Sequence, residues 1–521
     1  MANKNKLSIY LVKEGIDDKD DIFDKPENIS ELQKYQDGSI AYFVPSYVHE
    51  PAWLSSFFHQ SGNALLQQAN SRVVLLKRLT IDGEIRLFAL TFGYARFLFK
   101  EDVLEEQFGL RIILNSIQQN QIRRISKASV GSNQKQSDEQ LPKSSDISEF
   151  GFDINRDLMK NVSGKSDDEM FEKSMLTGGD IFSLTVERDI TNIDEFLVFC
   201  YHRYKQVTYK EKFAWIDNIK YVKDKSLVER LNQKLLEEIK EENFDKVWMA
   251  VPEVVIWEDI KDFKVSGDED FYGDIYIDKV IASLRNELTD ISQLQSKKIY
   301  ARSSKDEQNN AYEWSAYKCI VAEIELAQQQ YCLNNGKWYR IDNSFVDSIN
   351  MQYSGIALCE AAFVDHVNNV DEDTYNKELL VSLPNAHLLH TYKISIGGGQ
   401  GNNIEPCDLL WENKLIHVKK NGGSSVLSHL FNQALVSAQA WLDSSFRRQL
   451  CEKMQNANED AVIAEPFRSS EYEIIIAIIN KFHDEHPKIP FFSKVAVCFA
   501  ATNIKNLGYT IKLKNIKMVK D

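Results

Sequence analysis

The alternation of hydrophobic and polar positions predicts a chain in which strands and helices are mixed. Residues 7–13 (LSIYLVK) and 71–80 (SRVVLLKRLT) are rich in β-branched and aliphatic side chains, a pattern typical of strands. Residues 100–117 predict a helix that follows an aromatic segment at 91–99. Further along, residues 227–244 place apolar side chains at helical spacing with a charged outer face, which predicts an amphipathic helix.

The later part of the chain continues this mixture and indicates how it divides. Residues 310–334 predict a helix, Asn335-Gly336 a turn, and residues 337–342 a strand. Residues 124–148 are rich in Ser, Gln and Lys and poor in apolar residues, which is the composition of a solvated linker or mobile loop. We therefore expect a multidomain α+β protein.

Four segments follow from these patterns. They are an N-terminal α+β domain at 1–125, a polar linker or loop at 126–149, a middle α+β domain at 150–300 and a C-terminal domain at 301–521.

Composition narrows the class of protein. No apolar run approaches the roughly 20 residues that a membrane span requires, and the N-terminal residues lack the apolar core of a signal peptide. Seven cysteines, an odd number without a CxxC pair, argue against a disulfide framework and a cysteine-rich zinc site. We expect a cytoplasmic protein that does not contact membranes.

The net charge of −15 repels nucleic acid over long range, yet binding depends on local patches. Residues 481–521 hold eight lysines against three acids, a local charge of +5. Four lysines of the C-terminal domain are the candidates for contact with a nucleic-acid backbone: Lys420, Lys494, Lys512 and Lys514.

One region combines regular elements with polar side chains suited to chemistry. Between residues 371 and 442 the pattern predicts, in order, a helix at 371–383, a strand at 386–396, a glycine-rich loop at 397–403, a strand at 404–411, a tight turn at 412–414, a strand at 415–420 and a helix that begins near Ser425. Asp408 lies on one strand of a hairpin, and His417 and Lys419 lie on the next. Because strand side chains alternate, His417 and Lys419 point to one side, where they can share a site with Asp408.

This order, with "IEPCDLLWENKLIHVKK" at 404–420, resembles the core of the PD-(D/E)xK, or restriction-endonuclease-like, nucleases. The resemblance implies a core of helix, three-stranded mixed sheet, helix and further strands. It also implies hydrolysis of phosphodiester bonds in DNA, or alternatively RNA, with Mg²⁺ or Mn²⁺. Asp408 corresponds to the metal-binding aspartate and Lys419 to the catalytic lysine.

The sequence departs from that motif at two positions. Cys407 separates Pro406 from Asp408, and His417 occupies the position of the second acid. Glu405, or Glu378 from the first helix, then supplies the missing carboxylate. His417 would orient metal, water or phosphate, and Gln433 matches a glutamine that often follows in the second helix of the family.

A wider likeness spans nearly the whole chain. The segments "TFGYARFLF", "GFDINRDLM", "NNGKWYRID" and "CDLLWENKLIHVKKNGGSSVLSHLFNQALVSA" resemble a sporadically distributed, poorly characterised bacterial family associated with phage defence. That resemblance implies a defence setting, with a homo-oligomer or a partner protein of a defence system, but no established reaction.

Two other interpretations stay open. In the first, Asp408 and Lys419 have a purely structural role as an ion pair inside a packed sheet, since charges seldom stay buried unpaired. A catalytically inactive nucleic-acid-binding, scaffold or sensor protein on the same fold is the second alternative, favoured by the histidine at position 417.

Overall fold

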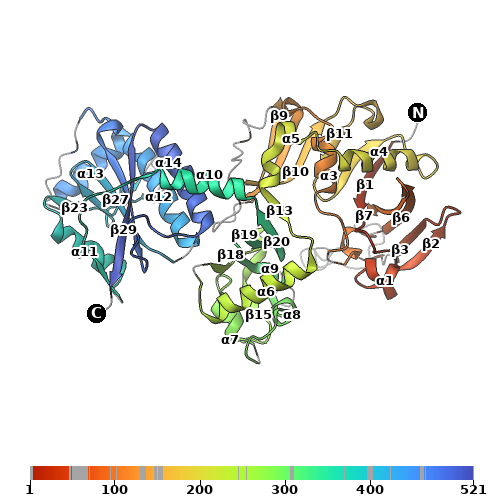
Figure 1. Cartoon of the computed structure of the whole chain (residues 1–521), viewed down its shortest axis with the longest axis horizontal. Helices are drawn as coiled ribbons and strands as arrows, with labels where there is room; N and C mark the ends of the chain where they lie inside the picture. Colours follow the sequence, from red (N-terminus) through yellow and green to blue (C-terminus); the bar gives the residue numbers. More distant parts are fainter. Residues whose placement is uncertain are drawn as a thin grey trace, which may run out of the picture. The chain divides into compact units, whose positions relative to one another are not determined.

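The computed structural model of the chain is a mixed α+β structure, as the sequence predicts (Figure 1). It describes residues 4–45, 48–49, 68–69, 71–93, 95–100, 102–129, 136–145, 150, 157–244, 246–253, 255–284, 286–304, 310–368, 370–395, 403–422, 424–457, 463 and 465–519. The chain is divided into two compact units. Unit 1 comprises residues 1–128 and 136–216, and unit 2 comprises residues 129–135 and 217–521.

Unit 1 is built on a ten-stranded sheet. The strands, in spatial order, are β2 (Ser30–Lys34), β3 (Ile40–Val44), β6 (Arg72–Ile81), β7 (Glu84–Gly93), β1 (Asn5–Leu11), β12 (Phe182–Val186), β11 (Met175–Gly178), β10 (Asp157–Lys165), β8 (Ile122–Ser129) and β9 (Gln136–Ser145). Helices α3 (Phe108–Leu114) and α4 (Ile193–Lys205) contribute apolar side chains to the same core as the sheet. The predicted strands at 7–13 and 71–80 correspond to β1 and β6.

Two glycines allow α3 to approach the sheet closely. A Cβ atom on Gly178 of β11 would lie 2.1 Å from the carbonyl oxygen of Gly109, and a Cβ on Gly109 would lie 2.0 Å from that of Ile181. These distances are far below any van der Waals contact, so only glycine fits at either position. The helix predicted at 100–117 is shorter in the structure and occupies only Phe108–Leu114.

The polar stretch after residue 124 differs from its predicted role as a linker. Strands β8 and β9 pair antiparallel within unit 1, so much of residues 126–149 belongs to the sheet, and residues 130–135 and 146–149 lie outside the described part. β9 is an edge strand, and polar side chains are common at sheet edges because they discourage pairing with other chains. The boundary between the units falls instead at residues 216 and 217.

The first part of unit 2 contains two antiparallel sheets. One has five strands, in the order β13 (Ile219–Tyr221), β20 (Lys337–Ile341), β19 (Gln329–Asn334), β18 (Ile320–Leu326) and β14 (Val247–Met249). The other has three strands, β15 (Ile260–Val265), β16 (Lys298–Ser303) and β17 (Asn310–Ser315). The predicted amphipathic helix is confirmed as α6 (Lys225–Lys240). Its buried apolar residues pack in one core with side chains from both sheets.

The prediction of a helix at 310–334 is wrong. Apart from the single turn α9 (Ala316–Cys319), this segment forms strands β17, β18 and β19. Ala327 and Gln328 take positive φ values of 53° and 62° and reverse the chain between β18 and β19. The predicted turn at Asn335-Gly336 is confirmed, since both residues have positive φ and join β19 to β20.

The C-terminal part of unit 2 contains a mixed sheet with a core on each face. Its strands follow the order β21 (Ala357–Leu358), β29 (Thr510–Val519), β28 (Glu473–Asn480), β27 (Lys414–Lys420), β26 (Leu409–Trp411) and β23 (Ala386–Leu388). β26 is antiparallel to β23 and β27, whereas β28 is parallel to β27 and β29. Helices α10 (Asn343–Ser354), α12 (Ser424–Trp441), α13 (Ser444–Asn456) and α14 (Phe491–Asn506) contribute to one core, and α11 (Glu372–Ser382) to the other.

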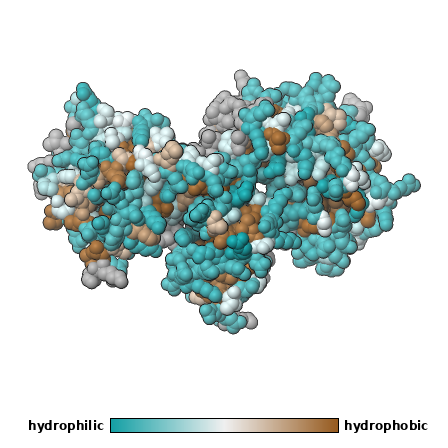
Figure 2. Space-filling view, viewed as in Figure 1, coloured by the Kyte–Doolittle hydropathy of each residue, from teal (hydrophilic) through white to brown (hydrophobic). Residues whose placement is uncertain are grey.

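The elements predicted between residues 371 and 442 form only in part. The strand predicted at 386–396 is limited in the sheet to β23, and the strand predicted at 404–411 is limited to β26. Between them, β24 (Ile394–Ser395) and β25 (Asn403–Ile404) pair with each other in a separate two-stranded sheet. The glycine-rich loop at 397–403 lies, except for Asn403, outside the described residues. Figure 2 shows a largely hydrophilic face on which apolar side chains stand in small groups. Among the described helices, none combines the length and apolar character needed to cross a membrane.

Candidate functional site

The candidate site lies where β26 begins and β27 approaches its end. Asp408 immediately precedes β26, and its backbone N–H donates to the carbonyl oxygen of Ile416 at 2.9 Å. Its side chain then continues the ladder, because the backbone N–H of Val418 donates to Asp408 Oδ2 at 2.8 Å. The carboxylate of Asp408, which is 8% exposed, thus takes the place of a strand partner.

A second carboxylate occupies the next position along β27. Lys419 Nζ donates to Glu372 Oε1 at 2.7 Å, and the backbone N–H of Lys420 donates to Glu372 Oε2 at 3.3 Å. Glu372 is the first residue of α11, where a negative side chain is favoured by the helix dipole. The N–H groups of residues 418 and 420 are therefore bound by two carboxylates, and the ammonium of Lys419 joins the same group.

Asn376 is the third side chain at this point. It lies one turn after Glu372 on α11, is 2% exposed, and donates from Nδ2 to Asp408 Oδ1 at 3.4 Å. Its amide oxygen Oδ1 is buried and has no hydrogen-bond partner among the described residues. A buried acceptor without a donor is costly, so this oxygen is suited to receive a ligand.

Two further charged groups border the site. His390 Nε2 lies 2.7 Å from Asp373 Oδ1, and Lys377 Nζ donates to Asp373 Oδ2 at 2.6 Å. The second ring nitrogen of His390 is buried without a partner among the described residues. His390 and Lys419 both lie close enough to lower the pKa of Asp408.

The electrostatic balance at Asp408 is unfavourable to its charged form. The pKa of this carboxyl is raised to about 6. Burial is the largest cause and the negative charge of Glu372 also raises the pKa, whereas the Val418 N–H, His390 and Lys419 lower it. A cation bound near Asp408 and Glu372 would offset both the cost of burying the Asp408 charge and the repulsion between the two carboxylates.

His417 does not join this group through any hydrogen bond or ion pair of the described residues. It is fully buried, and neither ring nitrogen has a partner. Strand alternation puts it on the face of Leu415, which packs in the core that contains α12. Burial lowers the pKa of His417 to about 4, so the imidazole is neutral at physiological pH.

The other predicted site residues lie in separate places. Gln433 Nε2 donates to Glu405 Oε2 at 2.9 Å, and no hydrogen bond or ion pair of the described residues connects this pair to Asp408. Glu378 lies on α11 but is exposed, on the side turned away from the buried residues of the helix. The structure thus brings Asp408 and Lys419 together and separates them from His417, Gln433, Glu405 and Glu378.

The four candidate lysines for nucleic-acid contact have different surroundings. Lys512 pairs with Glu473 at 2.7 Å, Lys514 donates to the carbonyl oxygen of Cys359 at 3.3 Å, and Lys494 donates to Asn350 Oδ1 at 2.8 Å. Burial lowers the pKa of Lys494, whose ammonium also lies 5.5 Å from the ring centroid of Tyr353. Lys420 has an exposed side chain beside the site.

The sequence contained a signal for Glu372 and Asn376. Tyr375, Leu379 and Leu383 mark the inward face of α11, and all three are buried. Glu372 and Asn376 precede Leu379 by seven and three residues, which places them on that face, whereas Glu378 is rotated by about 100°. Polar side chains on an otherwise apolar helix face would have identified them.

The oxygen atoms present fit a hard divalent cation. Mg²⁺ binds to proteins through one or two carboxylates and otherwise retains water, and Asn376 adds an amide oxygen that has no other partner. Within the described ranges, no three His, Cys, Asp or Glu residues form a group able to hold a metal, so a site here depends on the amide. The donor set of Asp408, Glu372 and Asn376 fits Mg²⁺ or Mn²⁺ and does not fit zinc.

Comparison with known proteins assigns the chain to a family. A model of a family of unknown function, DUF6119, matches residues 7–517, and the chain belongs to this family. Neither the curated proteins nor the solved structures contain a significant match.

Proposed function

We propose that the C-terminal part of unit 2 is a divalent-metal-dependent nuclease that hydrolyses phosphodiester bonds of DNA, with RNA as the alternative substrate. One observation carries the proposal: two carboxylates and a lysine from three different elements meet at one end of β26 and β27. Glu372 comes from α11, Asp408 precedes β26, and Lys419 lies on β27. A buried carboxyl with a raised pKa beside further charged groups is typical of functional sites.

The order of elements supports the same proposal. In chain order this part contains α11, β23, β26, β27, α12 and β28, with the β24–β25 pair inserted before β26 and α13 inserted before β28. Strands β23, β26 and β27 are antiparallel neighbours, and β28 is parallel to β27. This arrangement resembles the restriction-endonuclease-like core that the motif predicts. Glu372 and Asn376 replace Glu378 and His417 in the constellation that we propose.

Asp408, Glu372 and Asn376 would hold Mg²⁺ or Mn²⁺. A bound divalent cation stabilises charge on the phosphate and lowers the pKa of a bound water. The protein contributes position: the N–H groups of Val418 and Lys420 fix the two carboxylates, so neither side chain has to be ordered when substrate binds.

Lys419 would act on the reacting groups themselves. Its Nζ lies 2.7 Å from Glu372 Oε1 and the side chain is 32% exposed, so it would reach both solvent and a phosphate at the site. In this position it would orient the attacking water and stabilise negative charge on the phosphate. Lys420, exposed beside it, is placed to contact the neighbouring phosphate backbone.

The test is cleavage by the full chain. Supercoiled plasmid, single-stranded DNA and RNA are each incubated with wild-type protein in about 5 mM Mg²⁺ or Mn²⁺. Asp408→Asn, Glu372→Gln and Lys419→Met are each expected to lower the rate by more than about 100-fold. Glu378→Gln, an exposed change on the same helix, is the matched control and should retain the wild-type rate.

A second measurement separates metal binding from catalysis. Mn²⁺ should raise the melting temperature of wild-type protein and of Lys419→Met, but not that of Asp408→Asn, because only the last variant loses a ligand. If no substrate is cut with either metal, or if Asp408→Asn cuts as fast as wild type, the nuclease proposal is wrong.

The alternative is a nucleic-acid-binding, scaffold or sensor protein that does not cut. The ion pair between Lys419 and Glu372 favours it, because each charge already has a partner in the absence of any ligand. Retained binding of oligonucleotide without cleavage would support this alternative. The defence setting and an assembly with further copies or a partner protein stay predictions of the family resemblance.

A further inference from the structure

A pocket of about 260 Å³ lies in unit 1, far along the chain from the site above. Its floor is formed by strands β1, β6 and β7 through Leu7, Leu75 and Leu90, and Ile193 of α4 adds a further buried side chain. Tyr35 and Phe92 also line it, and Phe92 is 40% exposed. The lining is thus predominantly apolar, with exposed aromatic surface.

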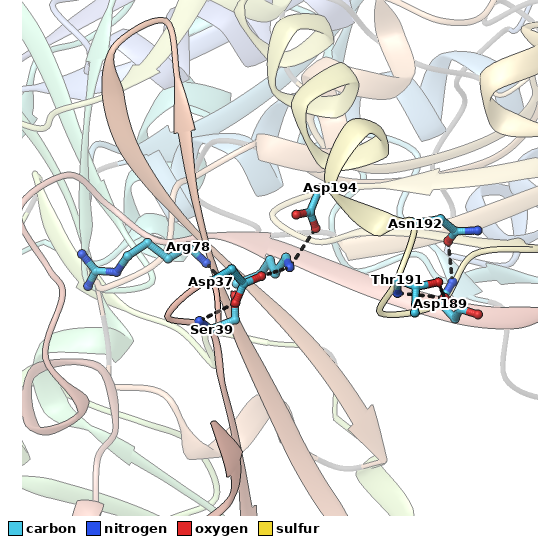
Figure 3. Close-up of polar contacts among 8 residues, drawn as sticks. Asp37, Ser39, Arg78, Asp189, Thr191, Asn192 and Asp194 are labelled. Atoms are coloured by element: carbon cyan, nitrogen blue, oxygen red, sulfur yellow. Dashed lines mark hydrogen bonds and ion pairs between the residues drawn. The ribbon is translucent and has the colours of Figure 1, made fainter. Parts of the chain in front are cut away.

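An ion-pair group around a buried lysine ties together three elements that border this pocket. Lys77 on β6 is 3% exposed; its ammonium contacts Asp37, in the turn between β2 and β3, and lies 2.8 Å from Asp194 Oδ1 in the first turn of α4. The hydrogen bond from Lys77 lowers the pKa of Asp37 to about 2. Figure 3 shows Asp37 and Asp194 approaching this group from the sheet and from the helix.

A tight turn fixes a second wall, the segment that leads from β12 into α4. Thr191 donates from its backbone N–H and its hydroxyl to Asp189 Oδ1, at 2.8 and 2.6 Å, and Asp189 N–H donates to Asn192 Oδ1 at 2.8 Å (Figure 3). Asn5 on β1 donates from Nδ2 to the carbonyl oxygen of Arg188 at 2.8 Å. The backbone of Arg188 is therefore tied to the sheet and to the start of α4.

Arg188 supplies the one cationic side chain in the lining of this pocket. Its guanidinium carbon lies 5.9 Å from the ring centroid of Phe196, and the guanidinium makes no hydrogen bond or ion pair with a described residue. Asp189 lines the pocket as well, but its Oδ1 is engaged twice within the turn. The pocket thus combines apolar walls with one arginine, whose guanidinium has no hydrogen-bond or ion-pair partner among the described residues.

We propose that this pocket binds a small organic anion: an apolar body with a single carboxylate or phosphate group. The apolar walls favour burial of a ring or a short hydrocarbon chain. The guanidinium of Arg188 matches the two oxygens of a carboxylate or phosphate, with which arginine forms paired hydrogen bonds.

The dimensions and rigidity of the pocket limit its occupant. Pockets for drug-sized ligands measure roughly 300–1,000 Å³, so this one suits a smaller molecule with one ring or a chain of comparable length. Because Lys77 and the turn at Asp189 hold elements that border the pocket, little ordering is needed when a ligand binds. A ligand with two separate anionic groups would require a second cation, and the described lining contains none.

The experiment uses full-length protein and three probes that share a phenyl body. 3-Phenylpropionate and phenyl phosphate carry the two candidate anionic groups, and 3-phenyl-1-propanol is the uncharged analogue. We expect one of the two anions to bind at a single saturable site by calorimetry with a Kd below about 1 mM, and the alcohol to bind at least about tenfold more weakly. Which anion binds decides between carboxylate and phosphate.

Three variants test the assignment. Arg188→Gln is expected to weaken binding by about tenfold or more, because the charged hydrogen bonds are lost. Arg78→Gln is the matched control: Arg78 also lies in unit 1, on β6, but it does not line the pocket and faces Asp17 at 3.5 Å, so binding should be unchanged. Val73→Phe fills part of the pocket and should abolish binding.

The result that overturns the proposal is specific. Saturable binding that Arg188→Gln or Val73→Phe leaves intact would place the anion elsewhere, and absence of saturable binding by both anions would exclude the class. Asp408→Asn should bind the anion as wild type does, so the outcome is independent of the nuclease proposal.

Discussion

His417 provides a prediction that follows directly from burial. The imidazole is fully buried, neither ring nitrogen has a hydrogen-bond partner among the described residues, and burial lowers its pKa to about 4 from the ordinary value of about 6.5. Between these two values the unfolded chain binds a proton that the folded chain does not bind. The free energy of unfolding must therefore fall as the pH is lowered from about 6.5 to about 4.

The size of this effect can be worked out from the two pKa values. At pH 5 the loss attributable to His417 is about 2 kcal/mol, and it reaches about 3 kcal/mol below pH 4, where the folded form also becomes protonated. His417→Leu removes both the titration and two unpaired buried nitrogens, each of which costs about 1–3 kcal/mol when a ligand or water does not satisfy it. The variant should equal or exceed wild type in stability at pH 7.5 and exceed it by a larger margin at pH 5.

The measurement must report on this part of the chain, because a protein of two units need not unfold in one step. Hydrogen exchange of the peptides that cover β27 and β28, at pH 5.0 and 7.5 and corrected for the intrinsic exchange rate, reports local unfolding. His429→Leu is the control, since the exposed side chain of His429 on α12 is solvated in the folded and the unfolded chain alike.

Two results would refute the reasoning. One is a wild-type difference between pH 7.5 and 5.0 that His417→Leu reproduces in full, which would mean that other groups cause it. The other is a loss of stability at pH 7.5 in His417→Leu, which would mean that the imidazole has a favourable partner.

Three further predictions concern packing, a helix terminus and the metal. Gly178→Ala should destabilise unit 1 by about 1–3 kcal/mol or more, because its Cβ meets a backbone oxygen of α3; urea denaturation followed by circular dichroism measures this, and wild-type stability would contradict it. Glu323→Ala should cost about 1–3 kcal/mol, since Phe492 N–H at the start of α14 donates to the buried Glu323 carboxylate at 3.1 Å; exchange of the α14 amides tests it, with exposed Glu325→Ala as control. Asn376→Asp should strengthen Mn²⁺ binding, measured as a larger metal-induced rise in melting temperature, whereas Asn376→Leu should abolish that rise; equal rises in both would exclude Asn376 as a ligand.

The sequence by itself determined the local order of the candidate region. Apolar spacing gave the helix at α11 and the strands at β26 and β27, and the short turn at Glu412, with φ of 52°, forces those two strands to pair. Asp408 and Lys419 therefore belong to neighbouring strands whatever the rest of the chain does. Such features depend on residues close in sequence, which is why periodicity and turn chemistry predict them.

Other features were decided only by the tertiary structure. Residues 310–334 satisfy a helical pattern, yet pairing with β14 and β20 and the shared core make them strands. The polar segment at β9 forms a strand because the edge of the sheet in unit 1 offers it hydrogen bonds.

In the candidate site, too, some features follow from local sequence and others from packing. Glu372 and Asn376 reach Asp408 only because α11 packs against the sheet with Tyr375 and Leu379 inward, a contact between elements that no local pattern encodes. His417 has the spacing from Lys419 that the motif requires, but the core that contains α12 encloses it. Local sequence fixed which strand carries each side chain, and packing decided which of those side chains meet, because burial of the apolar faces determines how helix and sheet dock.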